Sequence, residues 1–269
     1  MTLPHLHVES RGDGPVIALA HGFGGSARNF RAQARSLSDA WRVVTWDARG
    51  HARSDAPRDP AAYSLAALGE DVGRVLESQR ASEPKRPGER AIVGGLSLGA
   101  AAALAFARAQ PERVRALILA SYPASRRTHQ RGGFARSAHA FADAIENEGL
   151  EAAGERFVWG AGSGLDARGA AFVRQGFLEH APHALALTLR GVLAVLPEPE
   201  DLAEPLARLG IPTLLVAGGA DAGSVASHRA LAATSPDVRS VVIPDAGHVV
   251  NLAAPAAFDA ALREFLDAV

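Results

Sequence analysis

The chain has 269 residues, of which 48% are hydrophobic, and its formal net charge at pH 7 is −1. This balanced charge gives no reason to expect nucleic acid or an anionic membrane as a partner. There is no cysteine, which excludes disulfides, thiolate metal sites and a cysteine nucleophile. No apolar run approaches the roughly 18 residues of a membrane span, and the first residues lack the basic start and apolar core of a signal peptide. We therefore expect a cytoplasmic protein.

Short apolar segments alternate with helix-like segments over the first part of the chain. The expected strands are PVIALAHG (15–22), WRVVTWD (41–47), RAIVGG (90–95) and VRALILAS (114–121). Helical spacing is found over 26–39, 64–79 and 98–110, and Ser64 stands at the N-cap position of the second helix. Strands separated by helices in this way predict a parallel sheet covered on both faces.

The alternation stops at about Tyr122 and returns after Glu204. The residues between are helix-like throughout, apart from the break WGAGSG (159–164). Strands are expected again at 211–219 and 238–248, followed by a terminal helix. We therefore predict a core formed by residues 1–121 and 205–269, with a helical cap inserted at 122–204.

The segment Gly95-Leu96-Ser97-Leu98-Gly99 has the pattern G-x-S-x-G, with an expected strand before it and a helix after it. A sharp turn between strand and helix strains the serine backbone. It also brings strand and helix so close that only small residues fit two positions away, and glycines stand there. The pattern predicts that Ser97 is a nucleophile at the start of a helix, whose N-terminus carries partial positive charge.

A serine hydroxyl needs a base to remove its proton, and the base needs an acid to orient it. His248 stands at the end of the last expected strand, so it would emerge at the same sheet edge as Ser97. Asp221 follows the strand before that, at an equivalent position. The end of strand 114–121 carries no carboxylate, and Asp245 fits a turn residue better. These positions favour Asp221 as the acid partner of His248.

The order Ser97, Asp221, His248 resembles that of the α/β-hydrolase superfamily, and the similarity extends over nearly the whole chain. AHGFGG (20–25) is similar to the family's His-Gly turn, and DARGHARSD (47–55) to its D-x-R-G-x-G-x-S-D loop, with Ala52 where glycine is usual. The resemblance implies an α/β-hydrolase fold with a mostly parallel sheet of about seven strands, flanked by helices and carrying a helical cap. It also implies an oxyanion hole formed by the backbone N–H groups of Phe23 and Leu98.

Two further expectations follow from details of the resemblance. Only HLHVES (5–10) precedes the first buried strand, so the first strand of the family's N-terminal hairpin is expected to be missing. Asp47, Arg49 and Asp55 are interpreted as a structural cluster of ion pairs and turn contacts.

The predicted function is hydrolysis of a small carboxylic ester or lactone through an acyl-enzyme, as in small bacterial esterases and enol-lactone hydrolases. No metal or organic cofactor is expected. Carbon–carbon bond hydrolases of aromatic catabolism and cofactor-free perhydrolases share the same skeleton, and a lyase or a non-catalytic ligand receptor stays open. Serine in place of aspartate argues against dehalogenase and epoxide hydrolase activity. The sequence does not indicate an oligomeric state. Candidate substrate-binding residues are Gly24, Phe134, Phe141, Trp159 and Val249.

Overall fold

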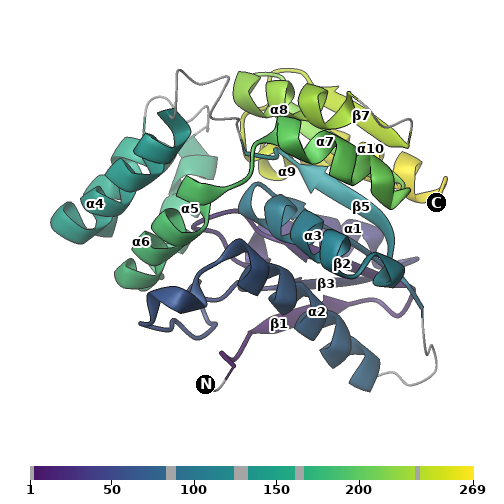
Figure 1. The fold of residues 1–269 in the computed structure, drawn as a ribbon, viewed down its shortest axis with the longest axis horizontal. Helices are drawn as coiled ribbons and strands as arrows, with labels where there is room; N and C mark the ends of the chain where they lie inside the picture. Colours follow the sequence, from purple (N-terminus) through teal and green to yellow (C-terminus); the bar gives the residue numbers. More distant parts are fainter. Residues whose placement is uncertain (1–2, 83–88, 124–132, 161–166, 234–236) are drawn as a thin grey trace.

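The computed structural model describes residues 3–82, 89–123, 133–160, 167–233 and 237–269. Its centre is a seven-stranded sheet with the order β1-β3-β2-β4-β5-β6-β7 (Figure 1). The strands are β1 (Val8–Arg11), β2 (Val16–Ala20), β3 (Arg42–Trp46), β4 (Ala91–Leu96), β5 (Val114–Ala120), β6 (Thr213–Gly218) and β7 (Val238–Ile243). All neighbouring strands pair in parallel except β1, which is antiparallel to β3. The predicted mostly parallel sheet of about seven strands is confirmed.

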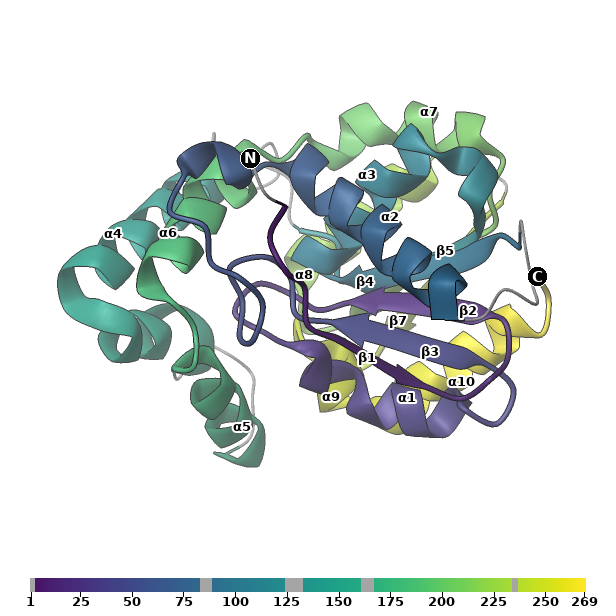
Figure 2. The same ribbon diagram turned by 90° about the horizontal axis from the view of Figure 1, so that it is seen from below.

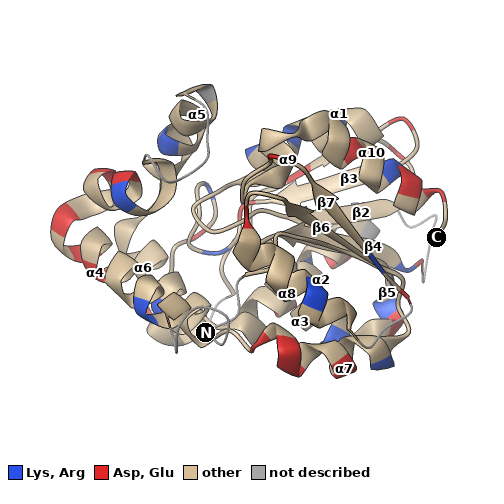
Figure 3. Cartoon of the chain, turned by 90° about the horizontal axis from the view of Figure 1, so that it is seen from above, with Lys and Arg blue, Asp and Glu red and all other residues tan. Residues whose placement is uncertain are grey.

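Helices cover both faces of the sheet, on opposite sides in Figure 2. The helices of the core are α1 (Arg31–Leu37), α2 (Leu65–Ser82), α3 (Leu98–Ala109), α7 (Pro199–Leu209), α8 (Ala222–Ala232), α9 (Val250–Ala253) and α10 (Pro255–Leu266). Successive residues of a strand point to opposite faces, so Ile17 and Leu19 pack with the residues of α1 and α10, and Ala18 and Ala20 with those of α2 and α3. Charged residues of both signs lie on the surrounding helices (Figure 3).

Strand β7 ends earlier than the sequence pattern predicted. The expected strand covered 238–248, but β7 stops at Ile243. Pro244 has no N–H to donate to a neighbouring strand, and Asp245 adopts a φ of +60°. The chain therefore leaves the sheet before His248, which lies in a loop at the sheet edge.

The segment between β5 and β6 contributes helices that extend beyond the end of the sheet (Figures 1 and 2). They are α4 (Gly133–Gly154), the single π-helical turn η4 (Glu155–Trp159), α5 (Ala167–Phe177) and α6 (Pro182–Gly191). Helix α7 crosses the expected boundary at residues 204 and 205, and it packs on α8 and α3 beside the sheet. The helices that stand apart from the sheet therefore end before Pro199. Among the described residues, no helix combines the length and apolar character that a membrane crossing requires.

Tight backbone packing at the start of α3 generates a stability prediction. A Cβ atom on Gly99 would lie 2.1 Å from the carbonyl oxygen of Ala20, which belongs to the neighbouring strand β2. Backbone atoms cannot move aside as a flexible side chain would, so Gly99→Ala is expected to lower the free energy of unfolding by about 2–4 kcal/mol. Urea denaturation measures this difference.

Gly176→Ala is the matched control, because a Cβ atom there meets nothing within 4 Å. This residue lies in α5, where alanine is expected to stabilise the helix by up to about 1 kcal/mol. Equal effects of the two substitutions would contradict the close approach at Gly99.

Candidate active site

Ser97 lies at the bend between β4 and α3 with φ 54° and ψ −111°, a conformation that non-glycine residues rarely adopt. Two backbone hydrogen bonds hold the bend: Ser97 N donates to Ala120 O at 2.8 Å, and Ala101 N donates to Ser97 O at 3.0 Å. A Cβ atom on Gly95 would lie 2.4 Å from Ala20 O, so the glycines of the motif meet a steric demand of the backbone. The side chain of Ser97 thus projects from a strained, well-supported turn.

His248 and Asp221 are joined by a hydrogen bond at the same edge of the sheet. His248 Nδ1 lies 2.6 Å from Asp221 Oδ2, so Nδ1 carries the proton and Nε2 keeps its lone pair. Asp221 also caps α8, since Ser224 donates to it through its backbone N at 3.1 Å and its hydroxyl at 2.5 Å. Burial alone would raise the pKa of Asp221, but the bonds from His248 and Ser224 outweigh it and hold this pKa well below its ordinary value.

Ser97, Asp221 and His248 line one cavity of about 650 Å³ between the sheet edge and the cap helices α4 and α5. No hydrogen bond joins Ser97 Oγ to the His248 ring, and both residues are within the described part of the chain. Catalytic hydrogen bonds are often long before substrate binds. The structure therefore brings the three residues to one cavity, with the hydrogen bond between His248 and Asp221 already formed.

Phe23 lies in a tight turn beside Ser97. Gly25 N donates to Gly22 O at 3.0 Å and closes the turn. A Cβ atom on Gly22 would lie 3.6 Å from Ser97 Cβ, so the turn packs directly against the serine. Leu98 is the first residue of α3, where backbone N–H groups have no partner within the helix. The N–H groups of Phe23 and Leu98 thus belong to two segments that flank Ser97.

Four of the five candidate substrate-binding residues line the cavity: Gly24, Phe134, Phe141 and Val249. Trp159 does not line this cavity, and its role in substrate binding stays a prediction. Its ring packs edge-on against Phe177 at 5.6 Å, and a Cβ atom on Gly154 would collide with it. Trp159 is therefore half-buried and packs against the cap, where glycine leaves room for the indole.

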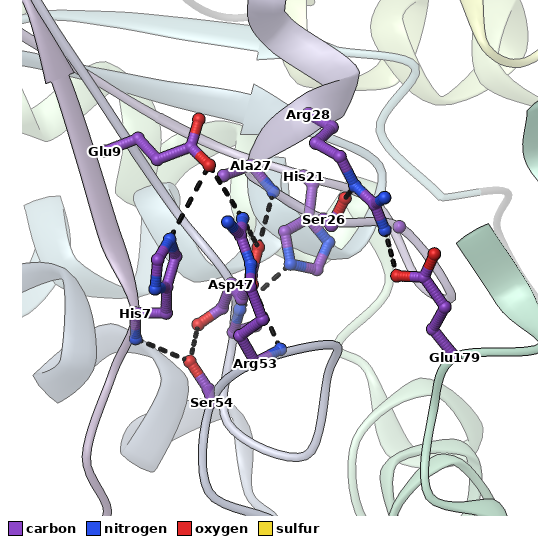
Figure 4. Close-up of polar contacts among 12 residues, drawn as sticks. His7, Glu9, His21, Ser26, Ala27, Arg28, Asp47, Arg53, Ser54 and Glu179 are labelled. Atoms are coloured by element: carbon purple, nitrogen blue, oxygen red, sulfur yellow. Dashed lines mark hydrogen bonds and ion pairs between the residues drawn. The ribbon is translucent and has the colours of Figure 1, made fainter.

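Asp47, Arg49 and Asp55 make structural contacts, as expected, but each of them contacts residues outside this group of three. Asp47 pairs with Arg53 at 2.9 Å and accepts the backbone N–H of Ala27 at 2.8 Å (Figure 4). Arg49 forms two hydrogen bonds with Asp71 of α2, at 2.7 and 2.8 Å. Asp55 accepts the backbone N–H of His5 at 2.8 Å. These are separate contacts that anchor the loop to its neighbours, rather than one mutual cluster.

The structure adds residues that the sequence analysis missed. Ser224 holds the carboxylate of Asp221, and the D-x-x-S spacing of a helix N-cap was the available signal. Arg28 and Asn29 of the short helix η1 (Ala27–Phe30) line the cavity, together with its N-cap residue Ser26. Arg28 forms an ion pair with Glu179 of the cap (Figure 4). No local pattern indicated this pair, because its members are far apart in the sequence.

Two buried histidines support the site without lining the cavity. His21 Nε2 accepts the N–H of Ala48 at 2.9 Å, so the ring proton is on Nδ1, which donates to Gly22 O at 2.7 Å. His228 of α8 accepts the N–H of Tyr122 at 3.1 Å. Burial lowers the pKa of each ring to about 4. Both residues are therefore neutral at physiological pH. Within the described residues, no group of three or more His, Cys, Asp or Glu side chains could hold a metal ion.

Comparison with known proteins shows what this arrangement resembles. A model of the alpha/beta hydrolase family matches residues 17–261. A thermophilic esterase from Thermogutta terrifontis is 28% identical with a TM-score of 0.82, and the match covers 98% of this chain and 93% of that one. The enol-lactonase from Burkholderia xenovorans LB400 is 25% identical with a TM-score of 0.73, over 98% of this chain and 97% of that one. The uncharacterized hydrolase YraK of Bacillus subtilis is 35% identical, but over only 42% of this chain and 40% of its own length.

The buried neutral state of His228 predicts a pH-dependent stability. Its pKa in the folded protein is about 4, below its ordinary value of 6.5, so the unfolded chain binds its proton first as the pH falls. This difference costs about 2 kcal/mol of stability between about pH 7.5 and about pH 5. In His228→Gln, the loss of unfolding free energy over this interval is expected to be smaller by that amount, measured by urea denaturation at both pH values.

His139→Gln removes an exposed histidine of α4 and is the control. It is expected to keep the wild-type loss of stability. A wild-type loss in His228→Gln would contradict the burial of a neutral ring at this position.

Proposed function

Because the chain belongs to the alpha/beta hydrolase family, we propose that it is a serine hydrolase that cleaves a small carboxylic ester or lactone through an acyl-enzyme. The observation that carries the proposal is the His248–Asp221 hydrogen bond on the wall of the cavity that also contains Ser97. Similarity to an esterase and an enol-lactonase over nearly the whole chain supports the same reaction class.

In the first step, Ser97 Oγ attacks the carbonyl carbon of the substrate and passes its proton to His248 Nε2. Asp221 remains ionised, holds the proton of Nδ1 and stabilises the imidazolium that forms. The N–H groups of Phe23 and Leu98 donate to the developing oxyanion, and each such donor contributes about 3–4 kcal/mol to transition-state stabilisation. The tetrahedral intermediate then breaks its bond to the leaving oxygen, which takes the proton from His248.

In the second step, a water molecule attacks the acyl-enzyme with His248 as the base. The same N–H groups stabilise the second tetrahedral intermediate, and Ser97 leaves with the proton from His248. The wall formed by Phe134, Phe141 and Phe157 is apolar, so we expect it to contact the apolar part of the substrate and to exclude water from the intermediate.

The substrate class is decided by a hydrolysis screen over short esters, lactones and vinylogous diketones in water enriched in heavy oxygen. The proposal expects turnover of esters or lactones, with solvent oxygen in the acid product. If the protein preferred the vinylogous diketones, its reaction would be carbon–carbon bond hydrolysis instead. Product without solvent oxygen would contradict hydrolysis and point to a lyase.

Removing the nucleophile tests the first step. Ser97→Ala is expected to lower kcat for a short p-nitrophenyl ester by about 10⁴-fold or more, while the circular dichroism spectrum stays that of the wild type. A fluorophosphonate is expected to label the wild type at Ser97 and to leave this variant unlabelled. Ser121→Ala is the matched control, because Ser121 is also buried at a strand end with a positive φ. Wild-type hydrolysis by Ser97→Ala would remove the nucleophile assignment.

Removing the charge of the acid tests the orientation of the base. Asp221→Asn is expected to lower kcat by about 10³–10⁴-fold, because asparagine favours the wrong tautomer of His248. Asparagine still caps a helix well, so the stability of α8 is expected to change little. Asp245→Asn, three residues before His248 in a left-handed turn, is expected to keep wild-type kcat. If Asp245→Asn lost activity and Asp221→Asn did not, the acid would be misassigned.

A further inference from the structure

The turn that carries Phe23 touches the cap at three successive residues. The ring of Phe23 packs edge-on against Phe141 and Phe177, at centroid distances of 5.6 and 6.3 Å. Gly24 has a φ of +68°, and a Cβ atom there would lie 2.5 Å from Phe177 Cδ2. Gly25 O lies 2.9 Å from His180 Nε2. The cap therefore contacts this turn directly at Phe23, Gly24 and Gly25.

His180 makes the polar part of this contact. It lies between α5 and α6, and only 5% of its surface is exposed. Its Nδ1 faces Phe177 O at 3.0 Å while Nε2 faces Gly25 O. Both partners are carbonyl oxygens, so each nitrogen would need a proton to bond. Burial lowers the pKa of His180, which favours the neutral ring with a single proton.

The other hydrogen bonds of the two carbonyl groups indicate which ring nitrogen of His180 carries that proton. Phe177 O already accepts the backbone N–H of His180 at 3.3 Å. In the described part of the chain, the ring of His180 is the donor that the structure provides for Gly25 O. Gly25 is half-buried, and a carbonyl that packing partly shields from water is stabilised by a donor. The arrangement therefore favours the tautomer in which Nε2–H donates to Gly25 O.

His21 holds the other end of the same turn. It donates to Gly22 O at 2.7 Å from the core side, and its opposite nitrogen is fixed by Ala48. The first and last carbonyls of the turn are thus bound by two histidines, one from the core and one from the cap. Phe23, whose N–H is the proposed oxyanion donor, lies between them.

We propose that His180 is a positioning residue for the oxyanion hole: its bond to Gly25 O sets the orientation of the Phe23 N–H when the cap is seated. The inference rests on the proposed acyl-enzyme function. This bond would couple the cap to the chemical step, because without it the turn could rotate its peptide groups away from the oxyanion. Loss of one aimed donor costs about 10²–10³-fold in kcat, so a misaimed donor is expected to cost about 10–100-fold.

The test compares three variants on a short p-nitrophenyl ester. His180→Phe keeps an aromatic ring of similar size and removes the donor. His180→Gln retains an N–H that can donate to Gly25 O. His183→Phe is the matched control, because His183 joins the same cap segment to a core carbonyl, Ala56 O, at 3.2 Å and does not touch the turn.

His180→Phe is expected to lower kcat by about 10–100-fold with KM within about threefold of wild type, because the donor acts on the transition state. The affinity for an alkyl boronic acid, which forms a tetrahedral adduct with serine, is expected to fall by a similar factor. His180→Gln is expected to recover most of kcat, and His183→Phe to retain it. Thermal unfolding of every variant shows whether the cap and core remain folded.

Wild-type kcat in a folded His180→Phe would overturn the inference. Equal losses of kcat in His180→Phe and His183→Phe would also overturn it, because the effect would then come from cap seating in general. If His180→Phe does not fold, His180→Leu, which also lacks a donor, takes its place. A folded His180→Leu with kcat at least about tenfold below that of His180→Gln supports the inference, and equal kcat in the two variants overturns it. A wild-type protein that neither hydrolyses esters nor reacts with fluorophosphonate would instead contradict the proposed function, so the two failures are distinguishable.

Discussion

The close approach of β2, β4 and α3 is the constraint on which the rest of the site depends. Ala20 O occupies the space that a Cβ atom on Gly95 or Gly99 would need. Ala20 and Gly95 are register partners in adjacent parallel strands, so this contact is built into the sheet. A strained residue such as Ser97 costs about 1–3 kcal/mol and persists only where its surroundings determine its conformation. The position of the hydroxyl is therefore set by the surrounding backbone, and not by the choice of a side-chain rotamer.

The same sheet edge gives Asp221 two tasks that reinforce each other. As the N-cap of α8, it accepts the backbone N–H of Ser224 at Oδ1, and its Oδ2 accepts both the Ser224 hydroxyl and the His248 ring. The bonds that cap the helix also keep the carboxylate ionised, which is the state that binds Nδ1–H. The orientation of the imidazole thus depends on the beginning of a helix, and a helix is a more rigid support than a free loop.

The parts of the site that the sequence predicted are those that local chemistry determines. The G-x-S-x-G bend could be predicted because the close packing around it requires small residues at neighbouring positions in the sequence. Asp221 and His248 could be predicted because the carboxyl ends of parallel strands lie at one edge of the sheet. Long-range packing was not predictable. Arg49 pairs with Asp71 from a helix, and Trp159 turns into the cap to fill the space beside Gly154. The end of β7 was also predicted too late, because the expected strand ran past Pro244, whose missing N–H ends the pairing.

The aromatic residues of the cap connect the size of the cavity to the geometry of the site. Phe141 stacks on Phe157 at 4.7 Å and on Phe177 at 5.9 Å, with interplanar angles of 16° and 10°. Phe141 and Phe157 line the cavity, whereas Phe177 is fully buried and contacts Gly24. Close-packed interiors transmit changes in volume to their neighbours. A smaller residue at Phe141 would enlarge the cavity and also loosen the packing around Phe23, so the size of the cavity and the geometry of the turn are coupled.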